Sequence, residues 1–141
     1  MSTLQPQQPG VPVPHPSRLS QRYWDGCRVG ELRFQRCDTC GLVPLRPTSL
    51  CARCHGRAFT WETSAGQGTL YSWTVVWRPP HPTFVVPYAP AIVELDEGLV
   101  LMSAMVGCEP EDLKEGMRVE VEFHPVSDTV TLPYFHPCAE A

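Results

Sequence analysis

Apolar and polar positions change their spacing twice along this chain of 141 residues. Apolar residues first recur at helical intervals in the segment 17–31, where Leu19, Tyr23, Trp24 and Cys27 share one face. Apolar residues are fewer in the middle of the chain. From residue 62 onward they alternate with polar residues in short runs, as is typical of strands. The pattern predicts a short N-terminal helix, a small module without a core of its own, and a β domain.

The two aromatic side chains of the predicted helix need a surface to pack on, because exposed apolar groups of this size are costly. We favour packing of Tyr23 and Trp24 on this chain's own middle module or on its β domain. The alternative is that they anchor in a partner protein.

The segment 62–136 contains five runs with strand character. These runs cover residues 68–77, 91–95, 99–106, 118–124 and 129–135. A helical turn at 110–116 separates the third run from the fourth. Five strands with a short helix after the third predict a Greek-key barrel of the OB type. The C-terminal part of the chain is therefore predicted to be a five-stranded OB-fold barrel.

A proline-rich connection at 78–90 separates the first two predicted strands. Its five prolines make it stiff, and Phe84, Val85, Val86 and Tyr88 give it an apolar surface. A long loop inside a small domain is usually functional. We expect it either to plug an open barrel end or to bind a partner, and the two roles are compatible.

Both ends of the chain are expected to lie outside the folded domains. Residues 1–16 are rich in Pro and Gln, which predicts a disordered leader. The same segment has no charged region followed by an apolar stretch, so it does not resemble a secretory signal. Residues 137–141 are expected to form a tail. Since no apolar run approaches about 18 residues, we expect no membrane span and a cytoplasmic location.

Two short cysteine pairs define the module at 32–61. Cys37, Cys40, Cys51 and Cys54 form two CxxC knuckles with ten residues between them. Two such knuckles wrap one metal ion in a tetrahedron of thiolates, as in zinc ribbons. Four protein ligands leave no position for water or substrate, so we expect structural Zn²⁺. A rubredoxin-like iron centre, which uses similar knuckles, is the alternative. The expected fold class is therefore mostly β: an N-terminal short helix, a rubredoxin-like zinc ribbon and a five-stranded OB-fold barrel.

The remaining reactive side chains predict no catalytic site. Cys27, Cys108 and Cys138 are isolated and are expected to be small core or surface residues. The five histidines form no recognisable motif in the sequence, and no phosphate-binding loop or nucleophile motif occurs.

Charge divides the chain into two unlike halves. Residues 1–61 hold eight arginines and three acidic residues, a net of +5, whereas residues 62–136 have a net charge of −8. A barrel that binds single-stranded nucleic acid needs a basic groove with stacking aromatics. The acidic barrel therefore argues against nucleic-acid binding.

The order of these parts resembles the acyl-CoA-associated zinc-ribbon/OB-fold family, long catalogued as a domain of unknown function. The resemblance runs from about residue 20 to residue 136. Its motifs are Tyr23-Trp24-Asp25-Gly26, the strand 31–37, both knuckles, and the segments 64–74, 87–88, 93–98 and 116–119.

The resemblance implies a non-catalytic accessory subunit. Members of this family accompany thiolases, thiolase-like aldolases or MaoC-like hydratases, in hetero-oligomers where acyl-CoA is bound mainly by the partner. The helix 17–31 and the loop 78–90 would then supply contact surface, and ribbon arginines would lie near the CoA phosphates. A stand-alone acyl-CoA-binding module is the alternative from another class.

Overall fold

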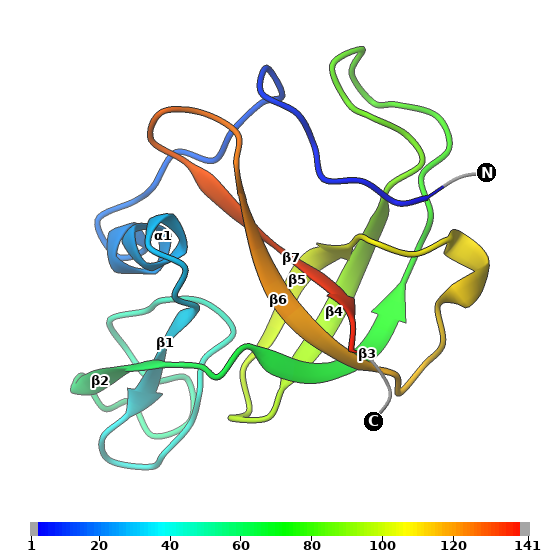
Figure 1. The fold of residues 1–141 in the computed structure, drawn as a ribbon. Coiled ribbons are helices and arrows are strands. Elements are labelled where there is room, and N and C mark those ends of the chain that lie inside the picture. Colours follow the sequence, from blue (N-terminus) through cyan, green and yellow to red (C-terminus); the bar gives the residue numbers. More distant parts are fainter. Residues whose placement is uncertain (1–2, 139–141) are drawn as a thin grey trace.

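A closed barrel and a two-stranded ribbon, with one short helix between them, make up the fold (Figure 1). The structure is a computed structural model and describes residues 3–138. The ribbon and the helix lie together beside the barrel, and the N-terminal segment crosses the barrel's far end.

The barrel contains five strands, as the sequence predicts. They are β3 (Gln67–Trp73), β4 (Ala89–Leu95), β5 (Val100–Met105), β6 (Arg118–Pro125) and β7 (Thr131–Pro137). Their order around the barrel is β3-β4-β5-β7-β6, and every pairing is antiparallel except that of β5 with β7. This is the closed Greek-key arrangement of an OB fold, so the predicted fold class is confirmed.

The barrel closes where β3 pairs with both β4 and β6. Gly68 stands opposite Leu95 on one side and Val119 on the other. A Cβ atom at Gly68 would lie 2.4 Å from the backbone oxygen of Glu94, so glycine lets the strands approach here. Side chains such as Leu70 and Phe135 fill the interior and are fully buried.

The ribbon is an antiparallel pair of β1 (Arg33–Cys37) and β2 (Phe59–Thr63). The strand expected at 31–37 thus begins two residues later than the sequence pattern indicates. Because β2 continues to Thr63, the expected boundary between residues 61 and 62 falls within a strand.

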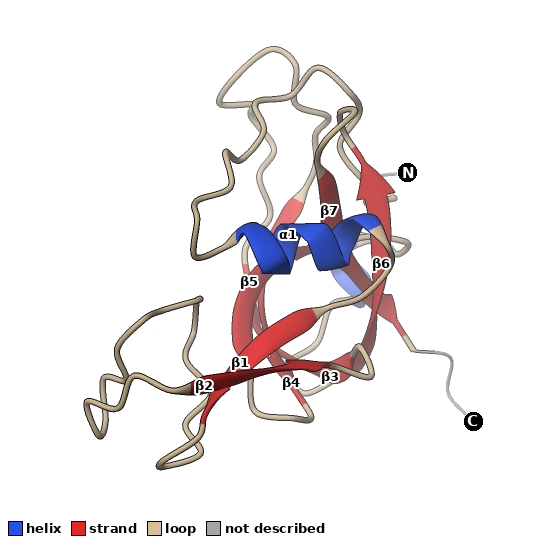
Figure 2. Cartoon of the chain, turned by 90° about the vertical axis from the view of Figure 1, so that its left-hand side faces the viewer, coloured by secondary structure: helices blue, strands red, loops and turns tan. Residues whose placement is uncertain are grey.

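The helix α1 covers Gln21–Arg28 and is shorter than the predicted segment 17–31. It begins after a turn in which the hydroxyls of Ser17 and Ser20 bind each other. Figure 2 shows α1 lying across the space between ribbon and barrel, and it contacts β1, β6 and β7. Cys27 is completely buried, and Tyr23 packs against the main core. Intramolecular packing of the helix is therefore confirmed.

The expectation of a disordered leader is wrong for residues 3–16. Leu4 is buried in the main core, and its backbone exchanges hydrogen bonds with Cys108 and Gly107. Val11 is also buried, in a second cluster with Val126 and Val130. A proline-rich chain has no internal hydrogen bonds, so its order comes from tertiary partners that composition does not reveal.

The proline-rich loop extends a hairpin beyond the barrel. β3 ends at Trp73 rather than at residue 77, although Val76 still pairs with Tyr88 through two backbone hydrogen bonds. Phe84 stacks on Tyr88 with 5.6 Å between ring centroids and packs against the second cluster. These contacts agree with the expectation that the loop plugs an end of the barrel. Its role as a binding surface stays a prediction.

Two further expectations concern the C-terminal half. The helical turn predicted at 110–116 is a single 3₁₀ turn, Pro110–Asp112. The predicted tail begins inside β7, which includes Pro137, and its last residues, 139–141, lie outside the described part. Within residues 3–138, no helix has both the length and the apolar character needed to cross a bilayer.

Candidate functional site

The fold brings all four knuckle cysteines together at one end of the ribbon. The Sγ atoms of Cys37 and Cys54 lie 3.6 Å apart, as do those of Cys40 and Cys51, and all four lie within 4.8 Å of one another. Zinc–sulfur bonds of about 2.3 Å in a tetrahedron require sulfur separations of about 3.8 Å. The cluster therefore fits a zinc ion without rearrangement.

Each knuckle turns back through a residue with left-handed backbone. Gly41 (φ 77°) and His55 (φ 63°) follow the second cysteine of each pair, and their N–H groups bind the carbonyls of Cys37 and Cys51 at 2.9 Å. The next residue after His55 is Gly56, whose N–H reaches the sulfur of Cys54 at 3.4 Å. Glycine tolerates this conformation readily, whereas histidine does so at a cost.

Backbone donors prepare the sulfurs for metal binding, because an N–H group stabilises a thiolate. The N–H of Cys40 lowers the pKa of Cys37, and that of Cys54 lowers the pKa of Cys51 to about 6. The N–H of Gly56 acts the same way on Cys54, but desolvation and hydrogen bonds with the other three sulfurs outweigh it and raise the pKa of Cys54 to about 12. A zinc ion bound among the four sulfurs would itself favour the thiolate form of each cysteine.

The remaining cysteines lie away from this cluster. Cys27 lies on the buried face of α1, and burial raises the pKa of its thiol to about 12. Burial also raises the pKa of Cys108, with Asp112 and Glu109 adding to the effect. Neither thiol is primed as a nucleophile, because nucleophilic cysteines have lowered pKa values.

The fold gathers two histidines that looked unrelated in the sequence. His124 on β6 and His136 on β7 both contact the carboxylate of Glu122, and the His136 Nδ1–Oε1 distance is 2.8 Å. The outward-facing side chains of neighbouring strands meet here. Within residues 3–138, however, only the four cysteines form a group whose ligand atoms all come within 4.8 Å.

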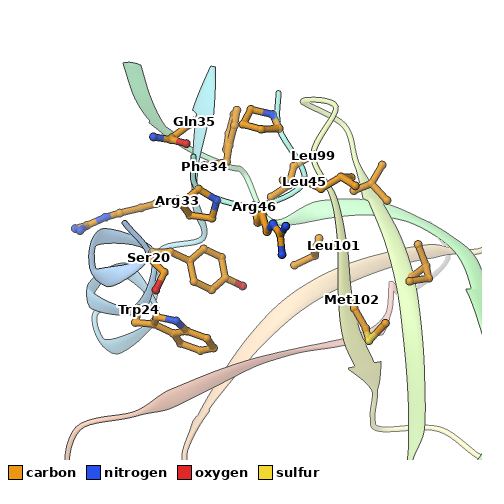
Figure 3. A pocket seen from close by; sticks show the side chains of 15 residues that line it. Ser20, Trp24, Arg33, Phe34, Gln35, Leu45, Arg46, Leu99, Leu101 and Met102 are labelled. Carbon is orange, nitrogen blue, oxygen red and sulfur yellow. The ribbon is translucent and has the colours of Figure 1, made fainter. Parts of the chain in front are cut away.

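A second candidate site is an apolar groove between α1, the ribbon and the barrel. Its volume is about 440 Å³. In Figure 3, Trp24 from α1 and Met102 from β5 lie on opposite sides of the hollow, with Arg46 between them. Leu45 and Met102 project most strongly, with 71% and 73% of their surface exposed. A groove of this size and lining is a site for an apolar group or for a partner's side chains.

Sequence reasoning identified Tyr23 and Trp24 but missed Leu45, Arg46 and Met102. A signal was present in the run 99–106, which is apolar on both faces of the predicted strand. The outer face of a barrel strand is ordinarily polar, so an apolar outer face indicates a covered surface.

Comparison with known families follows the same division into ribbon and barrel. Residues 24–60 match the family described as "ChsH2, rubredoxin-like zinc ribbon domain", and residues 61–124 match "ChsH2, C-terminal OB-fold domain". The chain belongs to the ChsH2/DUF35 family. It therefore contains a zinc ribbon, with Cys37, Cys40, Cys51 and Cys54 positioned for the metal.

Relatives of known sequence fall into two groups. A "DUF35 domain-containing scaffold protein" from Pyrococcus furiosus is 36% identical over 71% of this chain and 74% of its own length. A "Probable enoyl-CoA hydratase alpha subunit" from Thermomonospora curvata is 35% identical over 89% of this chain. The chain spans only 40% of that hydratase subunit.

Solved structures extend the comparison to the whole DUF35 fold. A chain of the "Ltp2-ChsH2(DUF35) aldolase" superposes with a TM-score of 0.83 at 32% identity, covering 90% of this chain and all of that one. A DUF35 protein of unknown function from Sulfolobus solfataricus shares the fold, with a TM-score of 0.62 at 12% identity over 87% of each chain.

Proposed function

We propose that this chain is a non-catalytic accessory subunit of a thiolase-fold enzyme, such as a thiolase-like aldolase, that acts on acyl-CoA thioesters. The observation that carries the proposal is the match of 90% of this chain to the whole of a chain of the Ltp2-ChsH2(DUF35) aldolase. In this proposal the subunit stabilises the complex and helps to form the substrate channel, while the partner binds most of the acyl-CoA.

Two features support a non-catalytic role. Three DUF35 relatives from archaea are called scaffold proteins. The cluster of Cys37, Cys40, Cys51 and Cys54 supplies all four ligands of a tetrahedron, so a zinc ion there would have no open position for water or substrate. Zinc in this proposal is structural and stabilises the ribbon, and the catalytic residues belong to the partner.

A hydratase of the MaoC-like class is the second candidate partner. The observation in its favour is that two relatives are named as hydratase alpha subunits. The chain spans 40% of one of these proteins and 35% of the other, so their activities concern much longer chains. The aldolase match covers the whole of its ChsH2 chain, which is why we place the thiolase-fold partner first.

The experiment is co-purification of the tagged chain under gentle conditions, with mass spectrometry of the eluate and a separate titration with hexanoyl-CoA. We expect a thiolase-fold protein in a stable complex and no tight binding of hexanoyl-CoA to the isolated chain. Tight binding without any partner would instead indicate a stand-alone acyl-CoA-binding module. Salt-sensitive retention on a polyanion column would favour nucleic-acid binding, which the acidic barrel opposes.

A further inference from the structure

The outer surface of β4 and β5 is apolar where a barrel surface is ordinarily polar. Cross-strand partners on this surface are Ile92 with Met102 and Pro90 with Ala104. Met102 exposes 73% of its surface, so the two strands present an uncovered apolar ridge. A contiguous exposed patch of this kind marks an interaction site.

Met102 stands at the junction of three hollows. One is the 440 Å³ groove beside α1 and the ribbon, a second of about 350 Å³ reaches Phe84 and Tyr88 of the proline-rich loop, and a third of about 200 Å³ reaches Trp73. Trp24 lines the first two. We call these three hollows together the Met102 face.

The composition of the Met102 face is that of a protein interface. Aromatic residues, methionine and arginine are enriched at interface cores, and acidic residues are depleted. The lining includes Tyr23, Trp24, Phe34 and Trp73, whereas no acidic residue among the described residues lines any of the three hollows.

Charge on the Met102 face is positive and partly unmatched. Among the residues that the structure describes, Arg33 and Arg46 are its only charged lining residues. Arg33 pairs with Glu31 at 2.9 Å. Arg46 is exposed and forms no ion pair within residues 3–138. A partner surface that carries a carboxylate opposite Arg46 would complement it.

We propose that the Met102 face is the surface on which the thiolase-fold partner docks. The partner inserts apolar side chains around Met102 and Leu45, and a partner Asp or Glu pairs with Arg46. This inference rests on the proposed function and names the surface through which the subunit would bind its partner. Leu45 and Met102 project from the surface as knobs, which suits a protein partner better than a small ligand enclosed in a cavity.

The test compares variants in their affinity for the thiolase-fold protein that co-purifies with the wild-type chain. We expect Met102→Glu and Leu45→Glu each to raise Kd about tenfold or more, because both place a charge in the interface core. Tyr71→Glu is the matched control, since Tyr71 is 63% exposed on β3 but lines none of the three hollows. It should change Kd by less than about twofold.

Arg46→Glu tests the charge assignment, with Arg57→Glu as the charge-matched control on the same ribbon. We expect Arg46→Glu to weaken binding about tenfold and to reduce its dependence on salt, whereas Arg57→Glu leaves both nearly unchanged. Zinc content and the urea unfolding midpoint of each variant verify that it is folded.

Three results would overturn the inference. If the wild-type chain captures a thiolase-fold protein and Met102→Glu and Leu45→Glu bind it equally well, the docking surface is elsewhere and the proposed function stands. If the wild-type chain captures none, both fail. If Met102→Glu instead abolishes self-association of the isolated chain or its binding of hexanoyl-CoA, the face serves a second copy or a ligand.

Discussion

The side-chain amide of Gln7 binds both backbone groups of Val85, 78 positions further along the chain. Gln7 Nε2 donates to the Val85 carbonyl at 3.0 Å, and the Val85 N–H donates to Gln7 Oε1 at 2.8 Å. The backbone N–H of Gln7 also donates to the Tyr134 hydroxyl. One residue of the leader thus ties the proline-rich loop to the barrel.

Replacing Gln7 with alanine should loosen this connection. We expect the free energy of unfolding to fall by about 1–3 kcal/mol, because a partly buried N–H and carbonyl lose their partner. Amide exchange at Val85 should become faster. Gln8→Ala is the control, since Gln8 is exposed and its loss should cost less than about 0.5 kcal/mol. Equal effects of the two substitutions would contradict the role of Gln7.

Removal of one knuckle cysteine should unfold the ribbon. We expect the wild-type chain to bind one zinc ion and to be colourless, and Cys54→Ser to lose the metal and most of the ribbon's protection from proteolysis. Structural zinc contributes on the order of 10 kcal/mol to small domains. Cys138→Ser should retain full zinc content by mass spectrometry. A red protein with visible absorption bands would show iron instead.

His55→Gly should stabilise the ribbon. A residue other than glycine in the left-handed conformation costs about 1–2 kcal/mol. Glycine removes that cost, but its greater freedom in the unfolded chain offsets about 0.5–1 kcal/mol of the gain. We therefore expect a net gain of about 0.5–1 kcal/mol in chemical unfolding. Gly41→Ala, at the equivalent position of the first knuckle, should destabilise the ribbon. A loss of stability in His55→Gly would mean that its imidazole has a structural role.

Stability should decrease with rising pH above about pH 9 because of Cys27. Its pKa is about 8.5 in an unfolded chain, and burial in the folded chain raises it to about 12. Between these values the unfolded state loses a proton that the folded state keeps, so the free energy of unfolding falls by up to about 1.4 kcal/mol per pH unit. Urea unfolding at pH 8 and pH 10 should show a shallower decrease for Cys27→Ala than for Cys138→Ala.

The parts that could be predicted from the sequence are those encoded by local spacing. Two CxxC pairs define a metal ribbon, because four sulfurs on two tight turns can reach one ion. The turn at Asp96–Gly98 and the alternating runs around it predict adjacent antiparallel strands, and Gly98 does adopt left-handed backbone there (φ 104°). Several strands in this order predict an OB barrel.

The parts that could not be predicted depend on contacts between distant segments. Leu4 and Gln7 look like members of an unstructured leader, yet both are buried because the segment after β5, the strand β7 and the proline-rich loop converge on them. The left-handed backbone of His55 could not be predicted either, because the residue type argues against the conformation that the knuckle geometry imposes.

Spacing along the chain thus predicted the zinc ribbon and the barrel, and the order of the motifs resembled a known zinc-ribbon/OB-fold family. Packing decided which apolar side chains remain exposed. Whether Met102, Leu45 and Arg46 share one surface depends on the docking of the ribbon beside the barrel through α1, and no local pattern encodes that relative placement. The hydrophobic effect rewards the burial of apolar area without specifying which faces remain exposed, so the exposed Met102 face emerges only from the assembled fold.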